Sequence, residues 1–250
     1  MATGNELVEI AVDDQHIAGT LIAPARAGPG VLFAHGWGGS QQQYLALARE
    51  VAGLGCVCMT FDLRGHARTD GQRDTVSRDK NLSDLLAAHD FLARQSGVDA
   101  SAIGVVGISY GAYLAAIMTS LRSVRWLAMR APALYKDAGW ELPKRRLHED
   151  PDLPGYRRRL VRSENNRALH ACAGFRGDVL IVESEHDDVV PHAVVANYVA
   201  ACAQARSVTA RLIEGADHAL SKKRWERAYT SFLVNWLVEM GIAATNGRDS

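Results

Sequence analysis

Residues 103–118 read IGVVGISYGAYLAAIM. The apolar run 103–108 predicts a short buried strand, and the small residues from Ala112 onward predict a helix. Between them lies Gly107-Ile108-Ser109-Tyr110-Gly111, a Gly-x-Ser-x-Gly pentapeptide in a strand–turn–helix setting. A tight turn leaves no room for side chains two positions before and after the serine, which explains both glycines. We therefore predict that Ser109 is a nucleophile.

Short apolar runs alternate with longer helical patterns along the chain. Residues 7–12 and 17–22 predict an opening hairpin, and further strands are predicted at residues 31–34, 56–61, 103–108, 126–129, 179–182 and 208–213. Apolar stripes of helical period cover residues 40–51, 82–92 and 225–240. Apolar strands separated by helices are typical of a sheet covered on both faces. The sequence thus predicts an α/β fold with a mostly parallel, eight-stranded sheet flanked by helices.

The composition excludes several classes of protein. At 250 residues, 48% hydrophobic and 22% charged, the chain is too apolar for disorder and suits a single domain, residues 1–250. Its 28 basic residues balance 28 acidic ones, so we expect neither nucleic acid nor membrane as a partner. The longest apolar stretch, residues 102–118, is shorter than the ~20 residues that a membrane-spanning helix needs. A homo-oligomer remains possible.

Cysteine use and the first residues predict a reducing compartment. Four cysteines in a chain of this length do not make a disulfide framework. Cys56 and Cys58 fall in a predicted strand, where we expect buried thiols. Residues 1–10 lack the basic and apolar regions of a signal peptide. We expect the protein to be cytoplasmic.

One region interrupts the alternation of strands and helices. Between residues 131 and 175 the chain carries repeated proline and glycine signals and two basic runs, residues 144–146 and 157–159. We predict a small, partly helical cap insertion at about residues 132–174, over one end of the sheet. Its basic side chains could bind an acidic substrate, but a solvated face is the favoured interpretation.

A serine hydroxyl needs a base to remove its proton, and the base needs an orienting carboxylate. His218 follows the last predicted strand and precedes the C-terminal helix. The segment after residues 179–182 offers several acids, among them Glu185, Asp187 and Asp188. The chain order serine, acid, histidine is one of the orders in which such triads occur.

With these residues the chain resembles the α/β-hydrolase family, from about residue 31 to the C-terminal helix. In that family an Asp-x-x-Val-Pro arrangement supplies the acid, which here selects Asp187 before Val190-Pro191 and leaves Asp188 as the competitor. The resemblance implies the α/β-hydrolase fold. The Ser-Tyr-Gly elbow is similar to that of prolyl-oligopeptidase-type serine peptidases, although the chain has no room for their propeller. Its size is similar to that of small carboxylesterases.

The resemblance also implies an oxyanion hole. The backbone N–H of Tyr110, at the start of a helix, is one predicted donor. The motif His35-Gly36-Trp37-Gly38-Gly39 is of the family's kind and implies the Trp37 N–H as the second. We interpret His35 as a residue that holds the loop, and the segment Asp62 to His66 likewise as loop architecture. The family's motif ends in glycine where this chain has Ala67.

These residues together predict a serine hydrolase that cleaves a carboxylic ester of a small acyl substrate through an acyl-enzyme. A serine peptidase, a thioesterase and a non-catalytic small-molecule receptor are the alternatives. Trp37, Tyr135 and Trp140 could line an acyl pocket, although core packing explains aromatic residues equally well. His186 and His192 lack a third metal ligand at a recognisable spacing, and no nucleotide motif occurs, so we expect neither metal nor cofactor.

Overall fold

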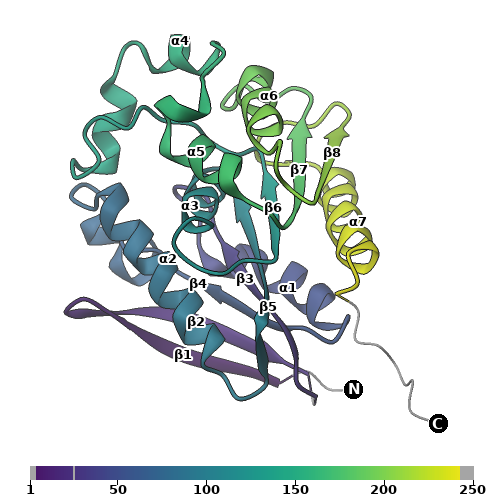
Figure 1. Ribbon diagram of the computed structural model, residues 1–250. Helices are drawn as coiled ribbons and strands as arrows, with labels where there is room; N and C mark the ends of the chain where they lie inside the picture. The colour runs from purple at the N-terminus through teal and green to yellow at the C-terminus, as the bar shows by residue number, and fades with distance from the viewer. Residues whose placement is uncertain (1–3, 25, 243–250) are drawn as a thin grey trace.

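The sheet at the centre of the molecule is seen in a computed structural model that describes residues 4–24 and 26–242 (Figure 1). Its strands are β1 (Gly4–Val12), β2 (Gln15–Ala23), β3 (Gly28–Ala34), β4 (Val57–Phe61), β5 (Val98–Ile108), β6 (Trp126–Arg130), β7 (Asp178–Ser184) and β8 (Ser207–Ile213). Their order is β1-β2-β4-β3-β5-β6-β7-β8. β1 and β2 form an antiparallel hairpin, β2 pairs antiparallel with β4, and all later pairs are parallel. The prediction of a mostly parallel, eight-stranded sheet is confirmed.

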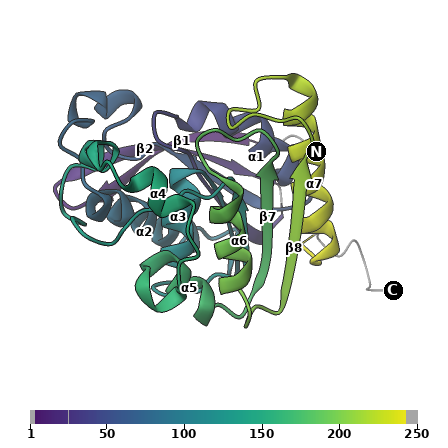
Figure 2. The same cartoon turned by 90° about the horizontal axis from the view of Figure 1, so that it is seen from above.

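Helices cover both faces of the sheet. The bounds are α1 (Leu45–Ala52), α2 (Arg78–Ala93), α3 (Tyr110–Met118), α4 (Leu153–Arg157), α5 (Arg167–Gly174), α6 (His192–Ala201) and α7 (Lys223–Glu239). Buried side chains of α2, α3, α5 and α6 form one core, and those of α1 and α7 form the other. Figure 2 shows β7 and β8 between α6 and α7. Because the central strands β4 and β6 are covered on both sides, every one of their residues is buried, and most are apolar.

The predicted first helix begins differently from the expectation. Residues Gln41–Tyr44 form a 3₁₀ turn, η1, and the α-helix starts only at Leu45. The Gln41 backbone N–H and its side-chain amide each donate to the Asp62 carboxylate at 2.8 Å. These two bonds tie the first turn to the end of β4, so tertiary contacts rather than helical propensity set its geometry.

The segment between β6 and β7 contains η3 (Lys144–Glu149), α4, η4 (Ser163–Asn165) and α5. Its last helix, α5, lies against α3 and contributes to the same core, whereas α4 lies above that layer (Figure 1). The exposed members of the two basic runs are Arg145, Arg146, Arg158 and Arg159. The solvated interpretation is wrong for Lys144 and Arg157, which are buried. Arg157 donates to the carbonyls of Leu134 and Val189 at 3.0 and 3.1 Å, which ties α4 to the loop after β7.

Two further observations concern the molecule as a whole. All four cysteines are free and buried, which confirms the expectation for Cys56 and Cys58. Across the described ranges, none of the helices has both the length and the hydropathy needed to span a bilayer.

Candidate active site

The turn between β5 and α3 holds Ser109 in a strained backbone conformation. Its φ of 51° and ψ of −111° lie outside the regions that residues with a side chain ordinarily occupy. The Ser109 amide donates to the Arg130 carbonyl at 2.9 Å. The Ser109 carbonyl accepts from the amides of Tyr113 and Ala133, each at 3.1 Å. Strain of this kind costs on the order of 1–3 kcal/mol, and these bonds to β6 and α3 hold it in place.

The two glycines of the pentapeptide are required for a more specific reason than the sequence suggested. A Cβ on Gly107 would lie 2.5 Å from Ala112 Cα, inside the first turn of α3. A Cβ on Gly111 would lie 2.3 Å from the Ala34 carbonyl oxygen, at the end of β3. The missing side chains therefore allow β5, α3 and β3 to approach one another, and the serine is positioned by that approach.

The structure brings Ser109, His218 and Asp187 into one hydrogen-bonded chain. His218 Nε2 lies 3.1 Å from Ser109 Oγ, and His218 Nδ1 lies 2.7 Å from Asp187 Oδ2. The Asp187 side chain is 3% exposed and that of His218 is 21% exposed. A carboxylate only accepts hydrogen bonds, so Asp187 places the imidazole proton on Nδ1 and leaves Nε2 as an acceptor facing the serine hydroxyl.

The competing acids lie elsewhere. Asp187 Oδ1 accepts the amides of Val189 and Val190 at 2.9 and 2.7 Å, and these bonds aim its second oxygen at His218. Asp188 is exposed. Asp217, the neighbour of His218 in the sequence, uses its carboxylate to accept from the backbone and hydroxyl of Ser221, so it holds the loop.

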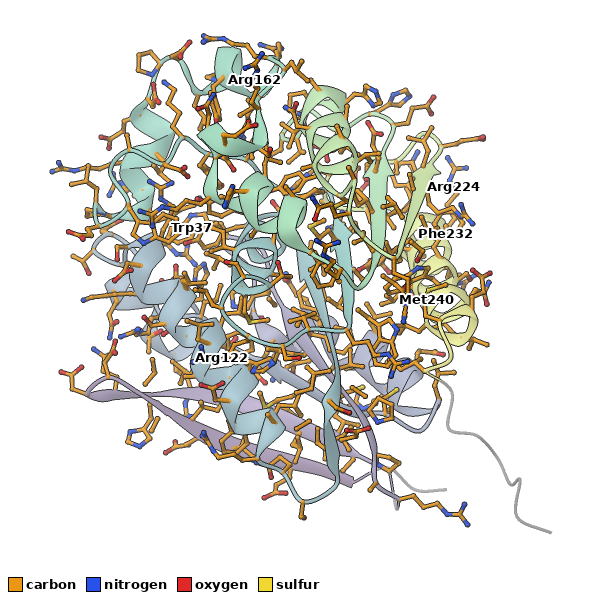
Figure 3. All side chains as sticks on the ribbon, viewed as in Figure 1. Trp37, Arg122, Arg162, Arg224, Phe232 and Met240 are labelled. Atoms are coloured by element: carbon orange, nitrogen blue, oxygen red, sulfur yellow. The ribbon has the colours of Figure 1, made fainter. Side chains whose placement is uncertain are left out.

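The two predicted oxyanion donors belong to segments that adjoin Ser109. Tyr110 is the first residue of α3, so its N–H has no acceptor inside the helix. A Cβ on Gly36 would lie 3.4 Å from Ser109 Cβ, which places the loop that carries Trp37 directly against the serine. Trp37 lies beneath the segment that carries η3 (Figure 3), and Lys144 Nζ is 4.2 Å from the centroid of its ring.

The remaining motif residues hold the loops of the site. His35 Nδ1 lies 2.8 Å from the Gly36 carbonyl, and the Leu63 amide donates to His35 Nε2 at 3.0 Å, so both ring nitrogens are used. Burial lowers the pKa of His35 and keeps it neutral.

Arg64 is fully buried and donates from its backbone and its guanidinium to the Asp84 carboxylate at 2.9 and 2.5 Å. Ala67 has a φ of 48°, the conformation for which glycine is better suited.

A cavity of about 450 Å³ opens at the serine. It is lined by the loop 36–39, Ser109 and His218. Of the three aromatic residues proposed for an acyl pocket, only Trp37 lines this cavity. Tyr135 and Trp140 belong to a buried aromatic cluster with Tyr113. For these two residues the core interpretation is the right one.

Several other residues line the cavity and were not singled out as site residues from the sequence, among them Tyr44, Arg130, Glu226 and Tyr229. Tyr229 was assigned only to the apolar stripe of the last helix. Arg130 ends the apolar run of β6, and the carboxyl ends of parallel strands are where α/β sheets bind ligands. Its place at the end of a predicted strand was the one signal in the sequence that could have marked Arg130 as a site residue, and no sequence motif surrounds it.

In the part of the chain that the structure describes, histidines and acids do not cluster in a way that suggests a metal. The His192 side chain is exposed, and its Nδ1 lies 2.8 Å from Glu183 Oε1. Within residues 4–24 and 26–242, no group of three or more His, Cys, Asp or Glu side chains is arranged to hold an ion.

Comparison with known proteins identifies the family. The model of the prolyl oligopeptidase family matches residues 40–241. The chain belongs to the prolyl oligopeptidase family. It is thus a member of the serine hydrolase superfamily, and its fold is the α/β-hydrolase fold. Both resemblances inferred from the sequence are confirmed.

This prolyl oligopeptidase family member has relatives of several kinds. It is 29% identical over 192 residues to an uncharacterised protein of Mycobacterium tuberculosis, covering 77% of the chain and 63% of that relative. The chain therefore spans somewhat less than two thirds of that relative. It is 31% identical over 109 residues to a thiohydrolase of Aspergillus aculeatus, covering 43% of the chain and 34% of the thiohydrolase. Among solved structures, an esterase of Pyrococcus furiosus is similar with a TM-score of 0.72 and 20% identity, over 96% of this chain and 94% of that one.

Proposed function

We propose that this protein is a serine hydrolase that cleaves a carboxylic ester of a small acyl substrate. Ser109 Oγ attacks the ester carbonyl while His218 Nε2 takes its proton. The oxyanion accepts hydrogen bonds from the Trp37 and Tyr110 amides. His218 then protonates the leaving alcohol, and water activated by the same ring releases the acid from the acyl-enzyme.

One observation carries this proposal: the hydrogen-bonded chain from Ser109 through His218 to Asp187, at 3.1 and 2.7 Å, beside a cavity of about 450 Å³. An unassisted serine hydroxyl is a weak nucleophile, and a neutral imidazole at hydrogen-bonding distance is the group that activates it. The buried Asp187 carboxylate stabilises the imidazolium that forms when the proton moves.

A thioester is the second candidate substrate. The 31% identity to a thiohydrolase over 109 residues favours it, and the same serine, base and oxyanion donors would serve both bonds. An ester is the first choice because the esterase of similar fold covers 96% of this chain, whereas the thiohydrolase match covers 43%. A peptide bond, the substrate that the family's name suggests, is the third.

The four free, buried cysteines support a reducing compartment, and we place the protein in the cytoplasm as part of the same proposal.

The test is covalent labelling with a fluorophosphonate, which reacts with activated serines. We expect Ser109 to be labelled. Ser109→Ala should abolish the labelling and lower the hydrolysis rate by at least about 10³-fold. Ser120→Ala is the matched control because Ser120 is an exposed serine that follows the same helix. An unlabelled wild-type protein would instead support a non-catalytic receptor.

A substrate panel then separates the three candidates. Purified protein is assayed with a 4-nitrophenyl ester, an acyl thioester and an aminoacyl 4-nitroanilide that carry acyl groups of matched size. We expect the ester to give the highest kcat/KM. A thioester hydrolysed faster than the ester would move the assignment to the second candidate, and anilide cleavage would move it to the third.

A further inference from the structure

Arg130 places a positive charge beside the candidate nucleophile. It is the last residue of β6, it is 7% exposed, and it lines the cavity. Its carbonyl accepts the Ser109 amide at 2.9 Å, and its Nη1 donates to the His218 carbonyl at 2.7 Å. The guanidinium therefore lies between the chain segments that carry the serine and the histidine.

The neighbours of this guanidinium do not balance its charge. Among the residues that the structure describes, no carboxylate forms an ion pair with Arg130, although Glu226 lines the same cavity. Arg64, which is 1% exposed, is by contrast paired with both Asp84 and Asp13. Tyr44 is a hydrogen-bond partner of Arg130, but burial raises the pKa of Tyr44, so its phenol stays neutral. A buried cation without an opposite charge is costly, and an anion in the cavity would remove that cost.

A second group supports an anion at the same place. The Tyr229 side chain lies beneath the guanidinium, with Arg130 Cζ 5.7 Å from its ring centroid, and it lines the same cavity. Tyr229 is 5% exposed, and its hydroxyl has no hydrogen-bond partner within the described ranges. Burial raises the pKa of Tyr229, so the hydroxyl keeps its proton and can donate it. The Tyr229 hydroxyl is thus a neutral donor without an assigned acceptor, and it lies beside a guanidinium that is hydrogen-bonded but not paired with a carboxylate.

We propose that the substrate carries a carboxylate in addition to its ester bond, and that Arg130 and Tyr229 bind this carboxylate inside the cavity. The inference rests on the proposed function. Because Arg130 and Ser109 line the same cavity, a carboxylate bound by the guanidinium would share that cavity with the ester bond at the serine. A cavity of about 450 Å³ suits a small hemiester of a dicarboxylic acid or an ester of a hydroxy acid.

The experiment compares charged and neutral esters of similar shape. One arm places the carboxylate on the acyl group, with 4-nitrophenyl hydrogen glutarate against 4-nitrophenyl hexanoate. The other places it on the leaving group, with 3-acetoxybenzoate against 3-methylphenyl acetate. The selectivity in each arm is the kcat/KM of the charged ester divided by that of the neutral one. We expect wild-type selectivity of roughly tenfold or more in one arm, which identifies the end of the substrate that binds Arg130.

Variants assign that selectivity to the two residues. Arg130→Met should reduce it by about tenfold or more, and Tyr229→Phe, which keeps the ring, by roughly three- to tenfold. Arg122→Met is the matched control, because Arg122 (labelled in Figure 3) is partly exposed and paired with Asp90. It is not among the residues that line the cavity. Thermal melts check that each variant is folded.

The alternative role for Arg130 is to hold the His218 loop through its 2.7 Å bond. In that case Arg130→Met would slow charged and neutral esters equally, the selectivity would not change in either arm, and the proposal would be overturned. Failure of the proposed function is a different result, since neither neutral ester would then be hydrolysed and Ser109 would not react with the fluorophosphonate.

Discussion

Substitution of Gly111 by alanine adds one methyl group where the structure leaves no room. Its Cβ would lie 2.3 Å from the carbonyl oxygen of Ala34 and 2.5 Å from that of His35. Both atoms belong to the backbone at the end of β3, so no side-chain rotation can relieve the contact. Because an ordinary contact of this kind is about 3.4 Å or longer, α3 and β3 must separate by roughly 1 Å.

That separation acts on the candidate oxyanion hole. Gly111 adjoins Tyr110, and His35 lies two residues before Trp37, so the methyl group pushes apart the segments that carry the two proposed donor amides. A displacement of about 1 Å at a reacting centre costs on the order of 10²-fold in rate. Overpacking of a buried contact costs about 1–3 kcal/mol of unfolding free energy. We expect Gly111→Ala to remain folded while losing about 10²-fold in kcat/KM.

Ester hydrolysis and urea unfolding measure these two effects separately. Gly174→Ala is the matched control, because Gly174 ends α5 and a Cβ there would meet nothing within 4 Å. The control should retain wild-type activity and change the unfolding free energy by less than about 1 kcal/mol. A Gly111→Ala protein with wild-type kcat/KM would refute the argument that the approach of α3 to β3 sets the geometry of the site.

The remaining predictions concern the acid and a buried histidine. Asp187→Asn should lower kcat by about 10⁴-fold at neutral pH, because the amide favours the wrong imidazole tautomer, and a loss below tenfold in ester assays would contradict it. Burial, with a contribution from His35, lowers the pKa of His66 to about 4. Below pH 6.5 the unfolded chain therefore binds a proton that the native protein does not, and roughly 3 kcal/mol of stability is lost as the pH falls from 6.5 to 4. Burial raises the pKa of Asp84 to about 6, which acts in the opposite direction, so the measurement is the difference in urea unfolding between wild type and His66→Phe across this range. Parallel pH profiles of the two proteins would count against the assignment to His66.

The sheet was predictable because burial on both faces makes its central strands largely apolar runs. The ends of the strands were less so. β5 begins at Val98 rather than at residue 103, since its first residues, including Asp99 and Ser101, are exposed and polar. They pair with the start of β3 across a register shift between Pro29 and Gly30, and a pairing of that kind leaves no pattern in the sequence.

The serine, the acid and the histidine were predictable for a different reason. Ser109 is fixed by a local turn that only a particular pattern of glycines allows. Asp187 was chosen over Asp188 by resemblance, and the structure supplies the physical basis in the two backbone amides that hold its carboxylate. The backbone of the neighbouring residues determines how the Ser109 and Asp187 side chains are oriented, and a short sequence motif can therefore predict them.

Contacts between segments that are far apart in the sequence produce no comparable sequence motif. Lys144 was assigned to a solvated face because it begins a basic run, yet its ammonium lies against the ring of Trp37. Tyr229 was assigned to helix packing, and it does pack in the core, but it also lines the cavity. In both cases the residue type is compatible with two environments, and only the packing of segments far apart in sequence decides between them.

The order of the strands explains why the site has the members that it has. β5, β6, β7 and β8 are consecutive neighbours in the sheet, and their carboxyl ends lead to Ser109, Arg130, Asp187 and His218 respectively. Ser109 is uncharged and the Asp187 carboxylate is hydrogen-bonded to His218, whereas Arg130 carries a buried positive charge. A neutral donor could hold the His218 carbonyl as well as a guanidinium does, without the cost of removing a cation from water. The presence of arginine at that position is therefore better explained by an anion that binds it than by the loop it supports.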